Sequence, residues 1–373
     1  MDDSRFSPKK RCRSDGEELD NFYIQNSPVD NQLTKIGGEV SPKTMESREG
    51  AMDDLNEIVN TTIDGQTAIV PVKSRNQNGK QAPIYTLVSF SYDESEELAI
   101  NARSKNKLTA FDKRVLNAIG TLWLSDKNIF SLNEIYCVAN AYTNKNPTGK
   151  QKASIKKSID KLKAISVKLD ITEEITKKNI PDKSVLIEKG ILTGEDDKID
   201  SIIMEGRLLP ISTCEITSKN GKKSLSIKLD DEPLLVTYNR AKRTLLSIPM
   251  EYMKTTNFNF SDRSVAFQDY LIKRIYGYGR GYFTQNKILY KTILETCGFN
   301  TEPEDSSEAS SNKFRQQKLR DRDLIKKIFN YWVSINLVDK FEEIVTPQGQ
   351  FEGVIFEMSK KIGGDNSSKQ IEG

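Results

Sequence analysis

The sequence predicts an α+β fold built from two domains of similar layout. The chain has 373 residues, which is long enough for two domains. In each half, apolar residues first recur about every 3.6 residues over three helical segments and then alternate with period 2 over a hairpin. Three helices followed by a hairpin is the order of a winged helix-turn-helix. The sequence therefore predicts two such domains in tandem, with a flexible N-terminal tail.

The domain limits follow from changes in composition. Residues 1–52 are rich in Ser, Asn, Asp, Lys and Gly and contain few apolar residues, which is typical of a disordered tail. The predicted organisation is a tail over 1–52, an N-terminal winged-helix domain with a long wing insertion over 53–235, a connector over 236–260, a C-terminal winged-helix domain over 261–360 and a flexible tail over 361–373.

The N-terminal domain begins with a hairpin of β-rich runs around an Asn-Gly-Lys turn. Two helices follow, each starting at a sequence typical of a capping box. A lysine-rich third helix precedes alternating strands, and the stretch Thr172–Leu208 is longer than a simple wing and predicts an insertion. The predicted elements are strands at Thr67–Lys73 and Pro83–Tyr92, helix starts at Thr109–Asp112 and Ser131–Glu134, and strands at Val167–Ile171, Ser201–Met204, Ile211–Ile216 and Ser224–Leu229.

The C-terminal domain repeats this order after a strand in the connector. Its second helix is expected to end at a glycine, and a solvated loop precedes its third. The predicted elements are a strand at Thr244–Pro249, helices at Ser261–Gly279 and Thr284–Phe299, a loop at Glu302–Asn312, a helix at Arg315–Ile335 and hairpin strands at Phe341–Val345 and Phe351–Met358.

The third helix of the first domain has an apolar stripe of Ile155, Ile159 and Leu162. A helix that enters the major groove needs small residues for close approach and cations for phosphates. The opposite face offers both, with Lys150, Ala153, Ser154, Lys157, Lys161 and Ala164. For an isolated helix of this kind, the alternative of an ordinary solvated face is favoured. The position of this helix before a hairpin instead favours DNA binding.

The third helix of the second domain carries arginines instead. Its core side is Leu324, Ile325, Ile328, Trp332 and Ile335, and its outward side is Arg315, Gln316, Arg322, Asp323 and Lys326, flanked by Lys318 and Arg320. Arginine can form two hydrogen bonds to guanine, and glutamine can form two to adenine. Leu319 also falls on the outward side, and nothing in the sequence explains an apolar residue at that position. The alternative is again an arginine-rich surface helix. The predicted DNA-contacting residues are Lys150, Ser154, Lys157, Lys161, Lys222, Lys223, Arg315, Gln316, Lys318, Arg322 and Lys326.

Several function classes are excluded by residues that the chain lacks. It contains no histidine, which removes Ser-His and Cys-His nucleophile pairs, histidine zinc sites and tyrosine nucleases that need a histidine-held metal. Its four cysteines lie far apart and predict neither a zinc site nor a disulfide scaffold, which fits a reducing cytoplasm. None of its Gly-Lys pairs has the second glycine of a phosphate loop. We therefore expect no enzymatic activity, no catalytic residue, no cofactor and no metal.

The net charge of +3 and the absence of long apolar runs limit the kinds of partner that the protein can have. Any nucleic-acid footprint must be local, since the whole chain is not a polycation. No run approaches the roughly 18 apolar residues of a membrane span, and the polar N-terminus is not that of a signal peptide. We expect a cytoplasmic protein that associates with the nucleoid or a plasmid.

Three segments resemble bacterial plasmid replication initiators, which are tandem winged-helix proteins of the iteron-binding Rep family: Leu108–Trp123, Lys152–Leu162 and Ile328–Ile344. The resemblance implies binding to short direct repeats at an origin as a monomer, and recruitment of host replication proteins, namely helicase and initiator. It also implies a homodimer through the N-terminal domain that represses its own promoter. The family has no catalytic residue. The remaining alternatives are a winged-helix transcriptional regulator without a replication role and a protein–protein adaptor.

Overall fold

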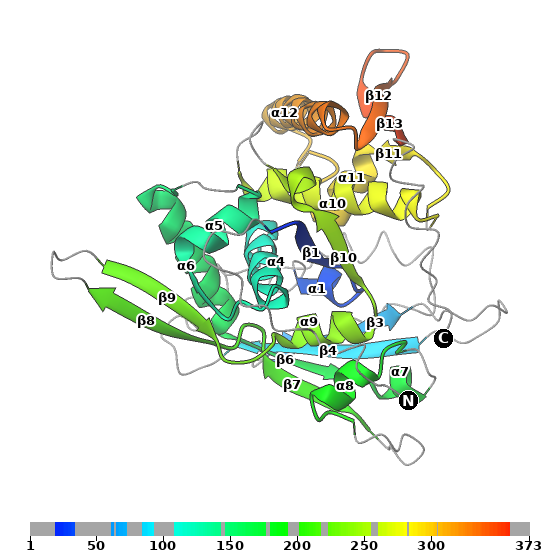
Figure 1. Ribbon diagram of the computed structural model, residues 1–373. Helices are drawn as coiled ribbons and strands as arrows, with labels where there is room; N and C mark the ends of the chain where they lie inside the picture. The colour runs from blue at the N-terminus through cyan, green and yellow to red at the C-terminus, as the bar shows by residue number, and fades with distance from the viewer. Residues whose placement is uncertain are drawn as a thin grey trace. The chain divides into compact units, whose positions relative to one another are not determined.

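The computed structural model describes residues 19–33, 61–62, 65–72, 84–92, 108–142, 146–176, 180–192, 201–217, 223–254, 260–281, 283–303 and 305–358 (Figure 1). The chain forms two compact units, Met1–Ile248 and Pro249–Gly373. Their boundary falls inside the predicted connector, residues 236–260. Both units combine helices with antiparallel strands, so the predicted α+β class is confirmed. Among the described helices, none has the length and apolar character to cross a membrane.

One part of unit 1 combines three helices with a three-stranded sheet. The elements are α4 (Ala110–Leu124), β5 (Ile129–Ser131), α5 (Leu132–Asn140), α6 (Gly149–Lys163), β8 (Ile211–Thr217) and β9 (Lys223–Leu229). The short β5 pairs with β9, which pairs in turn with β8, all antiparallel. Thr109 and Ser131 form reciprocal capping boxes with Asp112 and Glu134, so the predicted starts of the first two helices are confirmed.

A five-stranded sheet, in the order β2-β3-β4-β6-β7, also belongs to unit 1. The elements around it are β2 (Thr61–Thr62), β3 (Gly65–Val72), β4 (Ile84–Tyr92), β6 (Ile165–Asp170), α7 (Thr172–Thr176), α8 (Ser184–Glu188) and β7 (Ile203–Arg207). The predicted first hairpin is confirmed as β3–β4. The interpretation of Thr172–Leu208 as a wing insertion is wrong in one respect. This stretch supplies β7, which pairs with β6, and β6 pairs with β4, so it adds a strand to the five-stranded sheet and not to the β8–β9 hairpin. The reason is that Val167 and Leu169 of β6 alternate toward a buried face of the five-stranded sheet.

A buried carboxylate ties this sheet to α9 (Leu234–Ala241). Glu174 of α7 is fully buried; it accepts hydrogen bonds from Thr86 of β4 and from the Tyr238 hydroxyl at 2.7 Å, and it forms an ion pair with Lys242. Burial and the Glu174 charge raise the pKa of Tyr238 well above its usual value. A buried charge is tolerated when it is paired and its remaining lone pairs are hydrogen-bonded, as here.

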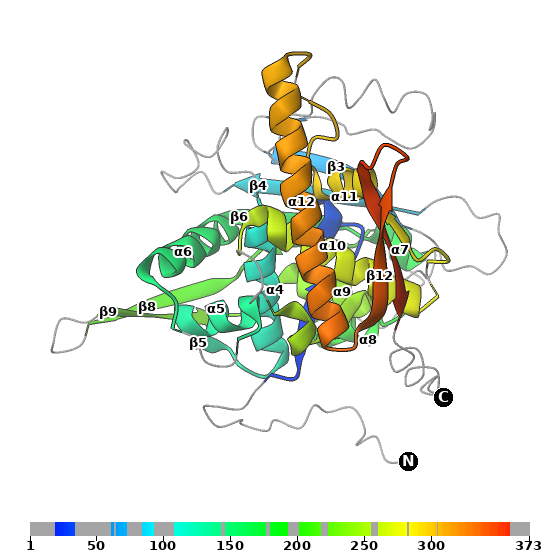
Figure 2. The same ribbon diagram turned by 90° about the horizontal axis from the view of Figure 1, so that it is seen from above.

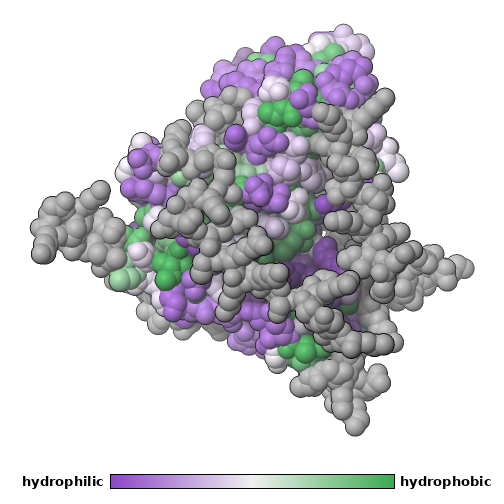
Figure 3. Space-filling view, in the orientation of Figure 1, coloured by the Kyte–Doolittle hydropathy of each residue, from purple (hydrophilic) through white to green (hydrophobic). Residues whose placement is uncertain are grey.

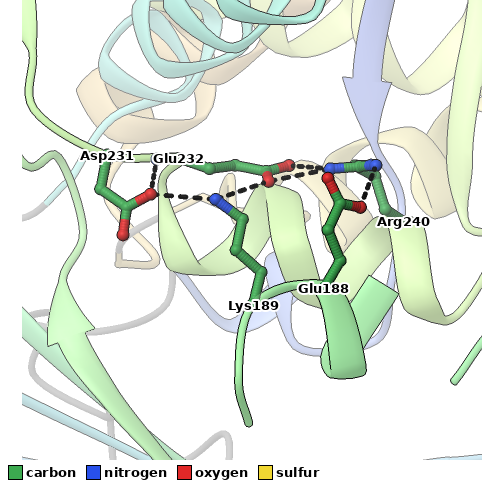
Figure 4. A network of polar contacts seen from close by, with 5 residues as sticks. All are labelled: Glu188, Lys189, Asp231, Glu232 and Arg240. Atoms are coloured by element: carbon green, nitrogen blue, oxygen red, sulfur yellow. Dashed lines mark hydrogen bonds and ion pairs between the residues drawn. The ribbon is translucent and has the colours of Figure 1, made fainter. Parts of the chain in front are cut away.

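A second polar network joins α8 to α9 near the surface of unit 1 (Figure 4). Lys189 lies 2.9 Å from Asp231 and 3.3 Å from Glu232. Arg240 lies 2.9 Å from the same Glu232 and 3.6 Å from Glu188. Carboxylates therefore surround both cations, and this part of the surface does not present free positive charge.

The first described segment corrects the prediction of a disordered tail. Its elements are β1 (Asn21–Gln25) and α1 (Asp30–Leu33), and β1 pairs with β10 (Leu245–Pro249), the predicted connector strand. Phe22 and Ile24 are fully buried. Thr121 Oγ1 accepts the Tyr23 N–H at 3.0 Å, and Asn239 Oδ1 accepts the Asn26 N–H at 3.2 Å. The polar composition of residues 1–52 hid this short alternating run; the rest of that range lies outside the described residues.

Unit 2 repeats the layout of α4, β5, α5, α6, β8 and β9 (Figure 1). Its elements are the 3-10 turn η2 (Met250–Met253), α10 (Asp262–Gly279), β11 (Lys287–Leu289), α11 (Tyr290–Cys297), α12 (Glu308–Ser334), β12 (Val338–Val345) and β13 (Phe351–Met358). The strand between the first two helices again pairs with the second strand of the hairpin, in the order β11-β13-β12. Trp332, Phe329 and Phe356 are buried in the core, and Trp332 Nε1 donates to the Tyr252 carbonyl at 3.0 Å.

Two boundaries in unit 2 differ from the predictions. The helix predicted over Thr284–Phe299 begins only at Tyr290, because residues 287–289 pair with β13; it does end at Gly298, whose φ is 74°. The loop predicted over Glu302–Asn312 is partly helical. Ser307 caps α12 by accepting the Ser310 N–H, and Glu308 lies favourably in the first turn.

Candidate nucleic-acid interface

The first half of α12 is exposed and basic. From Glu308 to Arg320 no residue is buried, and Asp321 is the first that is. This half contains one acidic residue, Glu308, and four cations: Lys313, Arg315, Lys318 and Arg320. In Figure 2 this end of α12 reaches beyond the β12–β13 hairpin. About three turns of positively charged helix are thus open to solvent.

A buried hydrogen-bond cluster fixes α12 at the point where it enters the core. Asp321 is 1% exposed and accepts from Arg263 Nε of α10 at 2.7 Å, from the Tyr290 hydroxyl of α11 at 2.6 Å and from Gln317 Nε2 at 2.8 Å. Burial, and then the hydrogen bond to Asp321, raises the pKa of Tyr290. One carboxylate therefore ties all three helices together and sets the direction of the exposed half of α12.

Three of the predicted DNA contacts lie on the exposed half of α12. Arg315 and Gln316 are exposed, and Arg315 makes no ion pair within the described part of the chain. Lys318 is half-buried, with its Nζ 5.7 Å from the centre of the Tyr290 ring. The two exposed side chains remain able to meet a ligand.

Arg322 and Lys326 are predicted to contact DNA, but both side chains are paired with a carboxylate of the hairpin. Arg322 donates twice to Glu343 of β12, at 2.6 and 2.7 Å, and Lys326 lies 3.3 Å from the same carboxylate. The Arg322 hydrogen bonds lower the pKa of Glu343. The prediction that Arg322 reads a base is therefore corrected: its planar fork is filled by a partner on the hairpin, and it fixes α12 to β12.

The β12–β13 hairpin lies beside α12 (Figure 2). Gly353 allows β11 to approach closely, since its φ is 155° and a Cβ there would lie 2.2 Å from the Ile288 carbonyl oxygen. Figure 3 shows that the surface in this region of unit 2 is mainly hydrophilic, with a few hydrophobic groups. The hairpin therefore extends the polar surface beside the helix.

The third helix of unit 1, α6, matches the prediction on its core side and in part on its outer side. Ile155, Ile159 and Leu162 are buried. Lys150 and Lys157 are exposed, and within the described part of the chain neither forms an ion pair. The Ser154 hydroxyl is exposed and donates to the Lys150 carbonyl at 3.1 Å, one turn back.

Lys161 and Ala164, at the C-terminal end of α6, do not face outward as predicted. Lys161 forms an ion pair with the buried Asp112 of α4 at 3.0 Å, and Ser158 donates to the same carboxylate. Ala164 is 8% exposed. The helical wheel gave the angles correctly but could not show that α4 and β6 cover this end of the helix. Of the lysines predicted at the β8–β9 turn, Lys222 lies outside the described residues and Lys223 begins β9.

Sequence reasoning missed part of the exposed surface of α12. The predicted loop includes Asn312, and the predicted contacts do not include Lys327, yet both residues are exposed on the helix. The signal for the earlier start was Ser307 followed by an acidic residue, a common N-terminal pattern. Within the described residues, no group of three His, Cys, Asp or Glu side chains is placed to hold a metal ion.

Comparison with known proteins gives few matches. No family model matches the chain, and no curated protein does. A crystal structure of domains 2 and 3 of RctB, as a selenomethionine derivative, matches at 14% identity and a TM-score of 0.38, covering 83% of this chain and 96% of that chain. A second crystal structure of the same domains matches at 13% identity and a TM-score of 0.42, covering 84% of this chain and 98% of that chain.

Proposed function

We propose that this chain binds double-stranded DNA sequence-specifically through two winged helix-turn-helix domains. The observation that carries the proposal is the exposed basic half of α12, a helix whose other half lies beside the β12–β13 hairpin. In a winged-helix domain the third helix enters the major groove and the hairpin follows the backbone. Unit 1 offers the same arrangement in α6 and the β8–β9 hairpin. Two such domains suit successive major grooves, whose centres lie about 34 Å apart.

The biological role that fits best is initiation of plasmid replication at an origin with direct repeats. It is supported by the resemblance of Leu108–Trp123, Lys152–Leu162 and Ile328–Ile344 to plasmid initiators. In this role the chain has no catalytic activity and needs no cofactor or metal. It recruits host helicase and initiator proteins, acts in the cytoplasm on plasmid DNA, and as a homodimer through the N-terminal domain represses its own promoter.

Selection from a randomised duplex library with the purified full chain tests DNA binding. The selected duplex should bind with strong salt dependence; if about six phosphates are neutralised, log K falls against log salt with a slope near −5. Lys157→Gln should make the slope shallower by about 1. The matched control is Lys156→Gln on the same helix, whose lysine is already paired with Asp160 at 2.8 Å, and it should change the slope less. An adaptor protein would bind no duplex even at low salt.

A replication assay separates the initiator from a transcriptional regulator of the same fold. A plasmid that carries only this gene and its flanking DNA should replicate in a suitable host, and footprinting should protect several direct repeats spaced by whole turns. A regulator would leave that plasmid unable to replicate and would protect a single palindrome.

A further inference from the structure

The outermost line of α12 is neutral or acidic, not basic. Asn312, Gln316, Leu319 and Asp323 follow one another at spacings of four, three and four residues, so they form one ridge along the helix. All four are exposed, and the ridge lies opposite the buried Ile325. We call these four residues the outer ridge.

Cations flank the outer ridge on both sides. At 100° per residue, Arg315 and Lys326 lie on one flank, while Arg320 and Lys327 lie on the other. Arg322, on the first flank, is bonded to Glu343 of the hairpin, so that flank faces the hairpin side of unit 2. A major groove has the complementary pattern, with phosphates along both rims and base edges on its floor.

Leu319 is the anomaly that this arrangement explains. Its side chain is 53% exposed at the centre of the ridge, among polar and charged neighbours. Isolated exposed leucines are common, but this one lies where a groove-binding helix would meet the bases. The C5-methyl group of thymine is the apolar feature of the groove floor, and aliphatic side chains contact it.

We propose that the outer ridge is the base-reading surface of the protein, with Leu319 against a thymine methyl group. This inference rests on the proposed DNA-binding function and makes it specific. The Gln316 and Asn312 amides can each pair with an adenine edge, and the Asp323 carboxylate can accept from cytosine N4. The flanking Arg315, Arg320 and Lys327 bind phosphates and set the register of the helix. Base reading thus moves away from Arg322, whose fork is already filled.

The third helix of unit 1 has a different outer line, which gives the proposal an internal contrast. There the exposed positions opposite the buried Ile155 are Lys150, Ala153 and Lys157. Lysines at the centre of a helix face bind phosphate as point charges and discriminate bases poorly. Unit 2 is therefore the domain that selects the sequence, and unit 1 contributes mainly backbone contacts.

The test replaces single thymines of the selected duplex by deoxyuridine, which removes only the 5-methyl group. The full chain should lose about fourfold in affinity at one thymine, the equivalent of one buried methyl group. Leu319→Ala should bind the thymine and deoxyuridine duplexes equally at that position. Leu319→Met, which keeps an aliphatic side chain, should retain part of the difference. Ile187→Ala is the matched control, since Ile187 is 48% exposed on α8, and it should keep the full difference.

The outcomes separate the two proposals. If no duplex is selected, the proposed DNA-binding function fails and the outer ridge fails with it. A second outcome is that a duplex is selected and Arg315→Ala weakens binding, but at every thymine the ratio of affinities for the thymine and deoxyuridine duplexes is the same in the parent and in Leu319→Ala. In that case DNA binding stands and the proposal for the outer ridge is wrong. Loss of the methyl effect in Leu319→Ala alone, at a single thymine, supports it.

Discussion

Replacement of Asp321 by Asn should destabilise unit 2 strongly. The carboxylate is 1% exposed and accepts from Arg263, Tyr290 and Gln317. Asparagine keeps one carbonyl acceptor but turns its amide N–H groups toward these donors and removes the charge opposite Arg263. Breaking a buried ion pair by removing one partner costs about 3–5 kcal/mol. Because the Arg263 side chain is 25% exposed, the lower end, about 3 kcal/mol, is expected.

Tryptophan fluorescence can measure this effect in the full chain. The protein has two tryptophans, and Trp123→Phe leaves only the buried Trp332 of unit 2 as a reporter. With a urea m-value of about 1.5 kcal/mol/M, the midpoint of unit 2 should fall by about 2 M. Asp323→Asn, at an exposed position of the same helix, is the control and should stay within about 0.5 kcal/mol.

The reasoning would be refuted by an Asp321→Asn midpoint within about 0.5 M of the parent, which at the same m-value is less than ~1 kcal/mol. A double-mutant cycle with Arg263→Gln tests the attribution to the pair. The two changes should be non-additive by about 1–3 kcal/mol, since both remove the same contact.

Three further changes have expected outcomes. Glu343 has a lowered pKa, so its contribution to stability is present above the unfolded-state pKa and is lost as pH falls through the folded-state pKa. Glu343→Gln should cost about 1 kcal/mol of stability at pH 7, and in urea titrations it should make the fall in stability toward acidic pH less steep. An unchanged dependence of stability on acidic pH would contradict this. Gly353→Ala should lower the free energy of unfolding of unit 2, obtained from the same urea titration, by at least ~2 kcal/mol, because the added methyl meets a backbone oxygen at 2.2 Å; a neutral result would mean that β11 moves freely. Glu174→Gln removes the charge that faces the buried Lys242 and should destabilise unit 1 by about 3–5 kcal/mol in thermal unfolding followed by circular dichroism, whereas a shift of under 1 °C would show that the pair is dispensable.

Local signals predicted the starts of α4 and α5 and the end of α11, but not α9, which lies inside the predicted connector. The capping boxes at Thr109 and Ser131 and the glycine at Gly298 are written within a few residues of the ends that they define. The hairpins at β3–β4 and β12–β13 also follow from local alternation and a turn. These features need no knowledge of what the segment packs against.

The errors in the candidate site come from partners distant in the sequence. Lys161 has the same angle on its helix as a free lysine would, and only the position of Asp112, 49 residues earlier, shows that it is paired. Arg322 is taken by Glu343, 21 residues later, through the register of a strand. A helical wheel gives the direction of a side chain but not the neighbour that occupies that direction.

The pairing of β1 with β10 has a consequence for synthesis of the chain. The contacts of Asn26 with Asn239 join residues 213 apart, which is most of the length of unit 1. At about 5–20 residues per second, a ribosome needs roughly ten seconds or more to make the second partner after the first. During that time Phe22 and Ile24 have no strand to pair with and are a target for chaperones. Unit 1 can complete its fold only as the first residues of unit 2 are being made, because β10 is the last strand of unit 1 to be synthesised.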